Sequence, residues 1–335
     1  MIKPYLFPAK LDALAATRAV EAFSTAAPFG EVEIDFARLE TPEPFAMLMI
    51  ACAARNLRNA GATFRLHNAD LRSYAAHMGL FAEFDEEYAP NQLAPRENER
   101  YVAIRTISRL DLLDEAAELK TAHVGDVIQR QADRLARLLT QEDKSVLVEA
   151  LAYCLREIIR NAYEHSRSDE ILICAQYRPS SNRVDMAFAD RGCGVFAALR
   201  SNASVEVTSE MDALKVALMP GISGTPKELR FEDDPWVNSG YGLFMTHQIC
   251  RAGGSFTICS GDAMIRLAGD QKTERKITNA GTIIGMSVQL DTLKNLNRKA
   301  LSAFAEEGSR IAKKLKGAIV TASAASVNLR IAETS

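Results

Sequence analysis

The first third of the chain alternates between short strand-like and helix-like patterns. Residues 31–36 alternate acidic and apolar side chains, which is the period of a half-buried strand. Residues 44–60 form a mostly apolar stretch that opens on a proline and is followed by a glycine, as expected of a buried helix. Residues 63–67 predict a second strand and residues 71–78 a second helix. We therefore expect a small α/β domain over residues 1–90.

The rest of the chain predicts a second α/β domain behind a connector. Residues 91–143 begin with a linker rich in proline, asparagine and charge, then a short strand at 101–107, and continue as one or two amphipathic helices. Residues 144–292 contain a long helix, a shorter helix over 243–250 and several strands, at 171–175, 184–188, 255–260, 263–267 and 283–290. Residues 293–335 predict a C-terminal helix and tail.

Composition narrows the class of protein. Of the 335 residues, 47% are hydrophobic and 25% charged, as in ordinary globular proteins, and the net charge of -3 gives no reason to expect nucleic-acid or membrane-surface binding. The six cysteines form no Cys-x-x-Cys pair, so we expect buried thiols rather than disulfides or zinc. The longest apolar run, residues 45–54, is too short for a membrane helix, and the N-terminus lacks a signal-peptide core. A cytoplasmic protein is expected.

Two polar motifs in the second domain are candidates for binding chemistry. Glu157 and Asn161 are four residues apart on the long helix, so they share one side of it. A carboxylate can orient or deprotonate water, and an amide oxygen suits magnesium. Asp190 directly follows a strand and precedes Gly192 and Gly194, where a carboxylate could accept a hydrogen bond from a base and glycines could let a flat ring approach. A solvated helix face and a tight turn are the simpler interpretations of the two motifs taken singly.

Two glycine motifs follow. Gly240 and Gly242 lie just before the helix that starts near Leu243, and such a turn presents free N–H groups and a positive dipole end to phosphate. Gly281 and Thr282 precede an apolar strand. Alone, the first is a common Gly-x-Gly turn and the second only a turn and the start of a strand.

Taken in order, the four motifs resemble the N, G1, G2 and G3 boxes of the GHKL superfamily. This superfamily includes histidine kinases, gyrase-type ATPases and anti-sigma-factor kinases. Its ATP-binding domain has the Bergerat fold, an α/β sandwich. The similarity covers roughly residues 145–290. It implies that residues 144–292 bind ATP with Mg²⁺ and that residues 195–239 form a lid, in which Lys215, Lys227 or Arg230 could reach phosphate.

The resemblance also implies a role for each matching residue. Glu157 would be the catalytic base and Asn161 the ligand of Mg²⁺. Asp190 would accept from the adenine amino group, and Thr282 would support the adenine through its hydroxyl. The remaining expected cofactor contacts are Gly192, Gly194, Gly240, Gly242, Leu243 and Gly281. His165 ends the helix that carries the N box, and a histidine often occurs near this place in the superfamily. A helix-terminal histidine that is favoured by the helix dipole explains it at least as well.

The N-terminal domain resembles a STAS domain, the small α/β fold of anti-sigma antagonists. The resemblance is carried by the strand at residues 32–36, the helix at 45–60 and the segments 61–66 and 77–81. Such antagonists usually have a phosphorylatable serine where the central helix begins, whereas this chain has Pro44 there and Thr41 as the nearest hydroxyl. A docking or dimerisation role is therefore expected in place of a phosphoswitch. An unrelated α/β module remains an alternative.

Three functions follow from these resemblances. The first is a Mg-ATP-dependent Ser/Thr protein kinase or ATPase of the anti-sigma-regulator type, acting on a regulatory protein partner. The second is an ATP-driven conformational or dimerisation switch without kinase activity. The third is a histidine kinase, for which His123 is the candidate acceptor, although its surroundings lack the usual acceptor motif. A homodimer is one arrangement that the resemblance leaves open.

Overall fold

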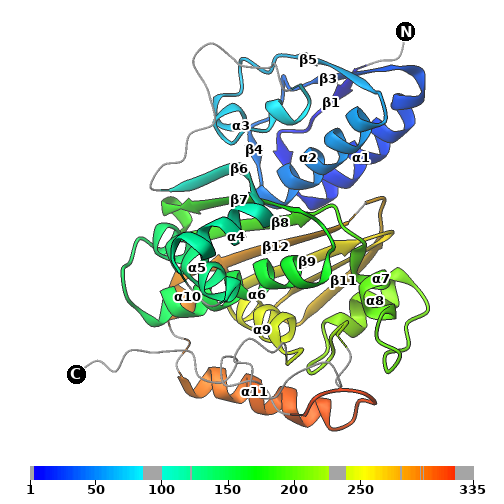
Figure 1. The fold of residues 1–335 in the computed structure, drawn as a ribbon. Coiled ribbons are helices and arrows are strands. Elements are labelled where there is room, and N and C mark those ends of the chain that lie inside the picture. Colours follow the sequence, from blue (N-terminus) through cyan, green and yellow to red (C-terminus); the bar gives the residue numbers. More distant parts are fainter. Residues whose placement is uncertain are drawn as a thin grey trace.

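The computed structural model describes residues 4–85, 100–120, 123–225, 239–279, 281–294, 296 and 298–320. It is a mixed α/β structure with a seven-stranded sheet, a three-stranded sheet and a two-stranded sheet (Figure 1). In the described part, no helix combines the length and the apolar character that crossing a membrane requires. All six cysteines are free thiols; five are buried, as the sequence predicts, and Cys193 is partly exposed.

The N-terminal part is a parallel three-stranded sheet with helices packed beside it. Its strands, in the order β1-β3-β5, are β1(Tyr5–Leu6), β3(Glu31–Asp35) and β5(Thr63–His67). The helices are α1(Ala13–Ala26), α2(Pro44–Asn59) and α3(Ser73–His77), so the predicted strands and helices are confirmed. The short strands β2(Lys10–Leu11) and β4(Thr41–Pro42) form a separate pair. Thr41 lies exposed in β4, just before α2.

The seven-stranded sheet contains only antiparallel neighbours, in the order β11-β10-β9-β12-β8-β7-β6. Its strands are β6(Tyr101–Ser108), β7(Glu170–Arg178), β8(Arg183–Asp190), β9(Gly254–Ser260), β10(Ala263–Ala268), β11(Gln271–Lys276) and β12(Thr282–Gln289). Strand β6, from the segment expected to be a connector, is one edge of this sheet. Strand β11 is the other edge, and all of its residues are exposed.

Helices from residue 109 onward cover one face of the large sheet (Figure 1). They include α5(Val124–Thr140), α6(Val146–His165) and α9(Gly242–Gly253), with α4(Arg109–Glu118) packed on α5. Two shorter helices, α7(Gly194–Arg200) and α8(Glu210–Ala217), pack together near β9 and β10. The last helices are α10(Leu290–Lys294) and α11(Arg298–Ala312), and α11 lies against α9.

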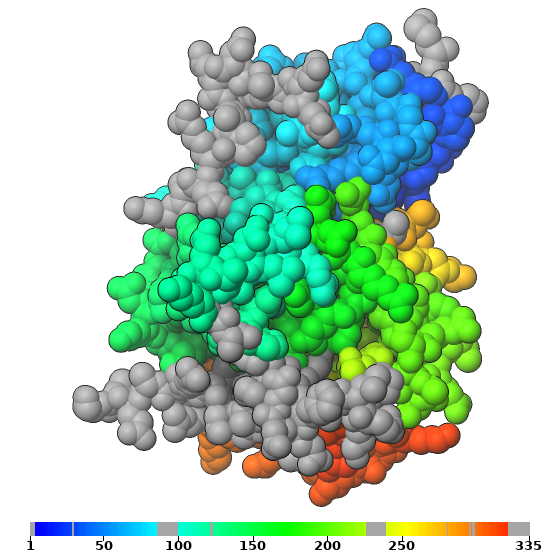
Figure 2. Space-filling view, viewed as in Figure 1, coloured from blue at the N-terminus to red at the C-terminus, as the bar shows by residue number. Residues whose placement is uncertain are grey.

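Helix α2 covers the opposite face of the large sheet, so the N-terminal part and the rest of the chain share a core. It contacts β7, β8 and β12, and its residues from Pro44 to Cys52 are buried. The Phe45 ring packs on Gly285 of β12 so closely that a Cβ there would lie 2.6 Å from it. In the space-filling view, the blue N-terminal part lies directly against the green part that carries the large sheet (Figure 2). The N-terminal part is thus packed onto the sheet rather than tethered to it.

Candidate functional site

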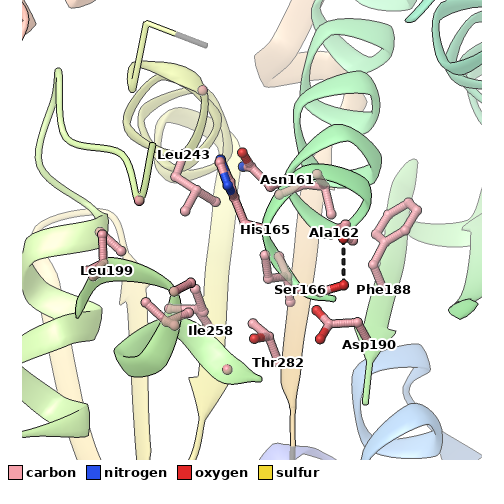
Figure 3. Close-up of a pocket in the computed structure, with 18 of the residues that line it drawn as sticks. Asn161, Ala162, His165, Ser166, Phe188, Asp190, Leu199, Leu243, Ile258 and Thr282 are labelled. Carbon is pink, nitrogen blue, oxygen red and sulfur yellow. Dashed lines mark hydrogen bonds between the residues drawn. The ribbon is translucent and has the colours of Figure 1, made fainter. Parts of the chain in front are cut away.

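One cavity gathers most of the polar residues predicted from the sequence. It lies between α6, the end of β8, the start of β12, the start of α9, and the segment around α7 and α8. Its empty space, including the part open to solvent, is about 840 Å³. Asp190 and Thr282 lie at one end, and Asn161, His165 and Leu243 lie at the other (Figure 3).

The Asp190 carboxylate is fixed where three strands meet. Asp190 ends β8 and is opposite Ile171 of β7 and Thr282 of β12. Its Oδ1 accepts from the Gly192 N–H at 3.0 Å, and the Thr282 backbone N–H also donates to the carboxylate. Burial raises the pKa of this carboxyl to about 6, although those two N–H groups act in the opposite direction. The carboxylate is therefore a rigid, poorly solvated hydrogen-bond acceptor at one end of the cavity.

Two predicted glycines shape the Asp190 end without lining it. A Cβ at Gly192 would lie 1.9 Å from the Ser166 carbonyl oxygen, at the end of α6. Gly281 has φ +78°, and a Cβ there would lie 2.0 Å from the Asp190 carbonyl oxygen. Gly192 thus lets the end of α6 come close, and Gly281 lets the Asp190 backbone come close, where a side chain would not fit. Gly194, which does line the cavity, opens α7 with φ +76°.

The other end is formed by a glycine turn that leads into α9. Gly240 and Gly242 line the cavity together with Leu243, and Gly240 has φ +74°. Helix α9 has 12 residues and starts at Gly242, so its first N–H groups lack partners within the helix. A helix start of this kind favours an anion. The turn is therefore suited to phosphate oxygens.

Asn161 and Glu157 lie in different surroundings although they share one side of α6. Asn161 lines the cavity, and Glu157 does not. The Glu157 side chain is 5% exposed and accepts from Arg156 at 2.6 and 3.1 Å. Its second oxygen lies behind the glycine turn, 2.2 Å from where a Cβ on Gly242 would be. The structure thus brings Asn161 to the cavity and holds Glu157 against Arg156 behind it.

The predicted residues thus fall into two groups. Those that line the cavity are Asn161, Asp190, Gly194, Gly240, Gly242, Leu243 and Thr282. Those that lie next to it are Glu157, Gly192 and Gly281.

No family model, curated protein or solved structure matches this chain.

Several residues of the cavity were not predicted from the sequence. Apolar side chains from distant segments form its walls: Ile158, Ala162, Ile171, Phe188, Val195, Leu199, Ile222, Ile258 and Ile284. Ser166 also lines it, and the Ser166 hydroxyl donates to the Ala162 carbonyl at 2.6 Å (Figure 3). These residues follow the ordinary patterns of core strands and helices, so nothing in the sequence distinguishes them from other buried positions.

The remaining candidate cations and histidines have other roles or lie outside the described residues. Lys215, on α8, forms an ion pair with Glu274 at 2.8 Å. Lys227 and Arg230 lie outside the described residues. His123 precedes α5, where its Nδ1 accepts from the Gly125 N–H at 2.9 Å. His165 lines the cavity. No cluster of three or more His, Cys, Asp or Glu side chains suited to a metal occurs among the described residues.

Proposed function

We propose that this chain is an ATP-binding regulatory protein of the GHKL type that holds Mg-ATP in the cavity around Asp190. One observation carries the proposal. Motifs on α6, at the end of β8, at the start of α9 and at the start of β12 all reach the same cavity. They are spread from residue 161 to residue 282, and each is weak alone. Their convergence on one cavity favours a shared ligand.

The Asp190 end suits a purine ring that carries an amino group. A buried carboxylate that is held by two backbone N–H groups can accept a hydrogen bond from an amino group. The apolar walls formed by Ile158, Phe188 and Ile284 can enclose a flat ring. Thr282, beside Asp190, adds a hydroxyl. Adenine offers the matching donor and the matching apolar faces.

The opposite end suits the triphosphate. The start of α9 and the turn at Gly240 and Gly242 would take phosphate oxygens through backbone N–H groups. The Asn161 side-chain oxygen would hold Mg²⁺, which prefers oxygen ligands and usually keeps some from the substrate phosphates. When bound, Mg²⁺ would neutralise charge on the phosphates.

The position of Glu157 bears on whether ATP is only bound or also consumed. As a base, Glu157 would have to exchange Arg156 for a water or a hydroxyl group. Glu157 is paired with Arg156 and does not line the cavity. This arrangement favours a switch that binds nucleotide without consuming it. The place of Glu157 one helical turn from Asn161 keeps phosphoryl transfer to a protein Ser or Thr as the second candidate.

The variant Glu157→Gln, assayed with isotope-labelled Mg-ATP, tests both functions. We expect the variant to bind ATP within about threefold of the wild type, because the residue does not line the cavity. Any hydrolysis or transfer should fall about 100-fold or more if Glu157 is the base. Binding is measured by calorimetry and turnover by released phosphate. Acid and base treatment of labelled protein tells phosphohistidine from phosphoserine.

Glu164→Gln is the matched control for this test, because Glu164 is also paired with an arginine of α6, Arg160 at 2.6 Å. It should leave binding and turnover unchanged. Undiminished turnover in Glu157→Gln would rule out the base role. Absence of any turnover in the wild type, with intact ATP binding, would leave the switch as the function.

Binding of adenosine should weaken as the pH falls below 6. The carboxylate of Asp190 is the acceptor, and its pKa is raised to about 6, so protonation removes it within this range. At pH 5 about one tenth of the carboxyl groups would be ionised, which predicts roughly tenfold weaker binding than at pH 8. Adenosine is the suitable probe because phosphate groups also titrate near pH 6. A dissociation constant that stays flat between pH 8 and pH 5 would contradict the role of Asp190.

The N-terminal part fits the same proposal as a STAS-like docking module. Its helix α2 packs against the large sheet. Thr41, just before this helix, is the nearest hydroxyl to its start in the sequence. We infer a role in relaying the nucleotide state to a regulatory protein partner or a second copy of the chain in the cytoplasm.

A further inference from the structure

The last described residues of the chain pass over the glycine turn at the phosphate end of the cavity. We name residues 313–320, which follow α11, the C-terminal strap. The Ile319 N–H donates to the Gly221 carbonyl at 3.0 Å, and the Gly221 N–H donates to the Gly240 carbonyl at 3.0 Å. The Tyr241 hydroxyl donates to the Val320 carbonyl at 2.7 Å. The strap is therefore bonded on both sides to the segments that hold Gly240.

The three segments are packed so closely that glycines are required where they meet. Gly221 has φ +78°, and a Cβ there would lie 2.2 Å from the Ile319 carbonyl oxygen. Gly240 has φ +74°, and its Cβ would lie 2.6 Å from the Ile222 carbonyl oxygen. Both the backbone conformation and the space exclude a side chain. The contact between strap and turn is thus a built feature of the fold.

Side chains secure the strap on either side of this contact. Ala318 packs against the small apolar cluster formed by Leu199, Ala213, Ala217 and Ile222. On α11, Gly308 lies against the rings of Tyr241 and Phe244, where a Cβ would be 2.9 and 2.8 Å away. Tyr241 itself is fully buried. The strap thus touches the back of the phosphate end, and no strap residue lines the cavity.

We propose that the C-terminal strap positions the Gly240–Gly242 turn for the phosphates of the nucleotide. The proposal rests on the proposed function. The strap's bonds fix Gly221 and, through it, the Gly240 carbonyl, so releasing the strap frees the turn. Its hydrogen bonds are with Gly221 and Tyr241, both at the phosphate end, so we expect the strap to affect binding of the phosphates and not binding of the adenine. Because linkage is reciprocal, bound phosphate also holds the strap in place. A partner that pulls the strap away would release nucleotide.

Two substitutions in the full chain test this role. Ile319→Pro removes the N–H that donates to Gly221, and Ile319→Ala is its matched control because it keeps that N–H. Tyr241→Phe keeps the buried ring and removes the hydroxyl that donates to Val320 and is also hydrogen-bonded to Ser309 of α11, so it tests the attachment of the strap and the helix before it even if the proline variant fails to fold. Dissociation constants for Mg-ADP and for adenosine are measured by calorimetry, and exchange of the Ile319 amide hydrogen is followed with and without Mg-ADP.

We expect Ile319→Pro and Tyr241→Phe to weaken Mg-ADP binding about tenfold and to change adenosine binding less than twofold. Ile319→Ala should bind both as the wild type does. Mg-ADP should slow exchange of the Ile319 amide in the wild type. Unchanged Mg-ADP affinity in Tyr241→Phe, or equal losses for Mg-ADP and adenosine, overturns the strap's role while leaving the proposed function intact. A wild-type chain that binds neither compound overturns both, and this shows before any variant is made.

Discussion

Asp190→Asn is expected to weaken ATP binding by roughly 10- to 150-fold, which corresponds to a lost charged hydrogen bond of about 1.5–3 kcal/mol. An asparagine oxygen can still accept from the Gly192 N–H, but its amide then presents donors to the adenine amino group, which is itself a donor. The fold should survive. Burial raises the pKa of Asp190 to about 6, so ionising this group makes the folded state less stable as pH rises toward and through 6. The neutral amide removes that cost at pH 8.

The matched control is Asp185→Asn on the same strand. Asp185 and Asp190 are equally buried, at 6% exposure, but Asp185 does not line the cavity. It is paired with Arg178 at 3.0 Å and Arg183 at 2.8 Å. Its variant should lower the free energy of unfolding and leave ATP affinity unchanged. Calorimetry and urea unfolding at pH 8 measure both quantities. Wild-type affinity in Asp190→Asn would refute the proposed adenine contact.

Gly281→Ala should destabilise the protein by about 2–5 kcal/mol. Gly281 has φ +78°, which costs an alanine about 1–2 kcal/mol. Its Cβ would also lie 2.0 Å from the Asp190 carbonyl oxygen, a backbone atom that cannot rotate away. The backbones of β8 and β12 would have to separate at the Asp190 end, at a further cost of about 1–3 kcal/mol. ATP affinity should fall with stability, because Asp190 moves.

Gly269→Ala provides the comparison that separates the two costs of Gly281→Ala. Gly269 has φ +53° in the turn between β10 and β11, and a Cβ there would meet nothing within 4 Å. Gly269→Ala should lower the free energy of unfolding only by the backbone cost of about 1–2 kcal/mol, and its ATP affinity should equal that of the wild type. The free energies of unfolding come from urea titrations of both variants. Equal losses of unfolding free energy in the two variants would mean that an alanine at position 281 does not clash with the Asp190 backbone.

The elements that carry the site were predictable because each has a strong local pattern. Helix α6 has a continuous apolar face, and β8 and β12 are nearly continuous apolar strands that end or begin at a polar motif. Asp190 and Thr282 became directly opposite residues only through the pairing of β8 with β12, which sequence order alone does not specify. The order of the motifs could be predicted from the sequence. That the motifs meet at one cavity could be seen only in the structure.

Other features left no local signal. Strand β11 is wholly exposed at the sheet edge, so its residues show no apolar alternation. Helix α8 lies within residues 195–239, where the sequence leads us to expect a lid and no helix, although Ser209 caps it by accepting from the Asp212 N–H at 3.1 Å. The burial of α2 against the large sheet depends on Gly285 and Phe45, which are 240 positions apart. The ion pair of Glu157 with its neighbour Arg156 is a matter of side-chain conformation, which periodicity does not report.

The most direct test of the account is a crystal structure with a non-hydrolysable ATP analogue and Mg²⁺ at saturating concentration. We expect the adenine amino group at the Asp190 carboxylate, the phosphates at the Gly240–Gly242 turn, and the metal at the Asn161 side-chain oxygen. An analogue bound in any other place, or with its phosphates at Asp190, would contradict it.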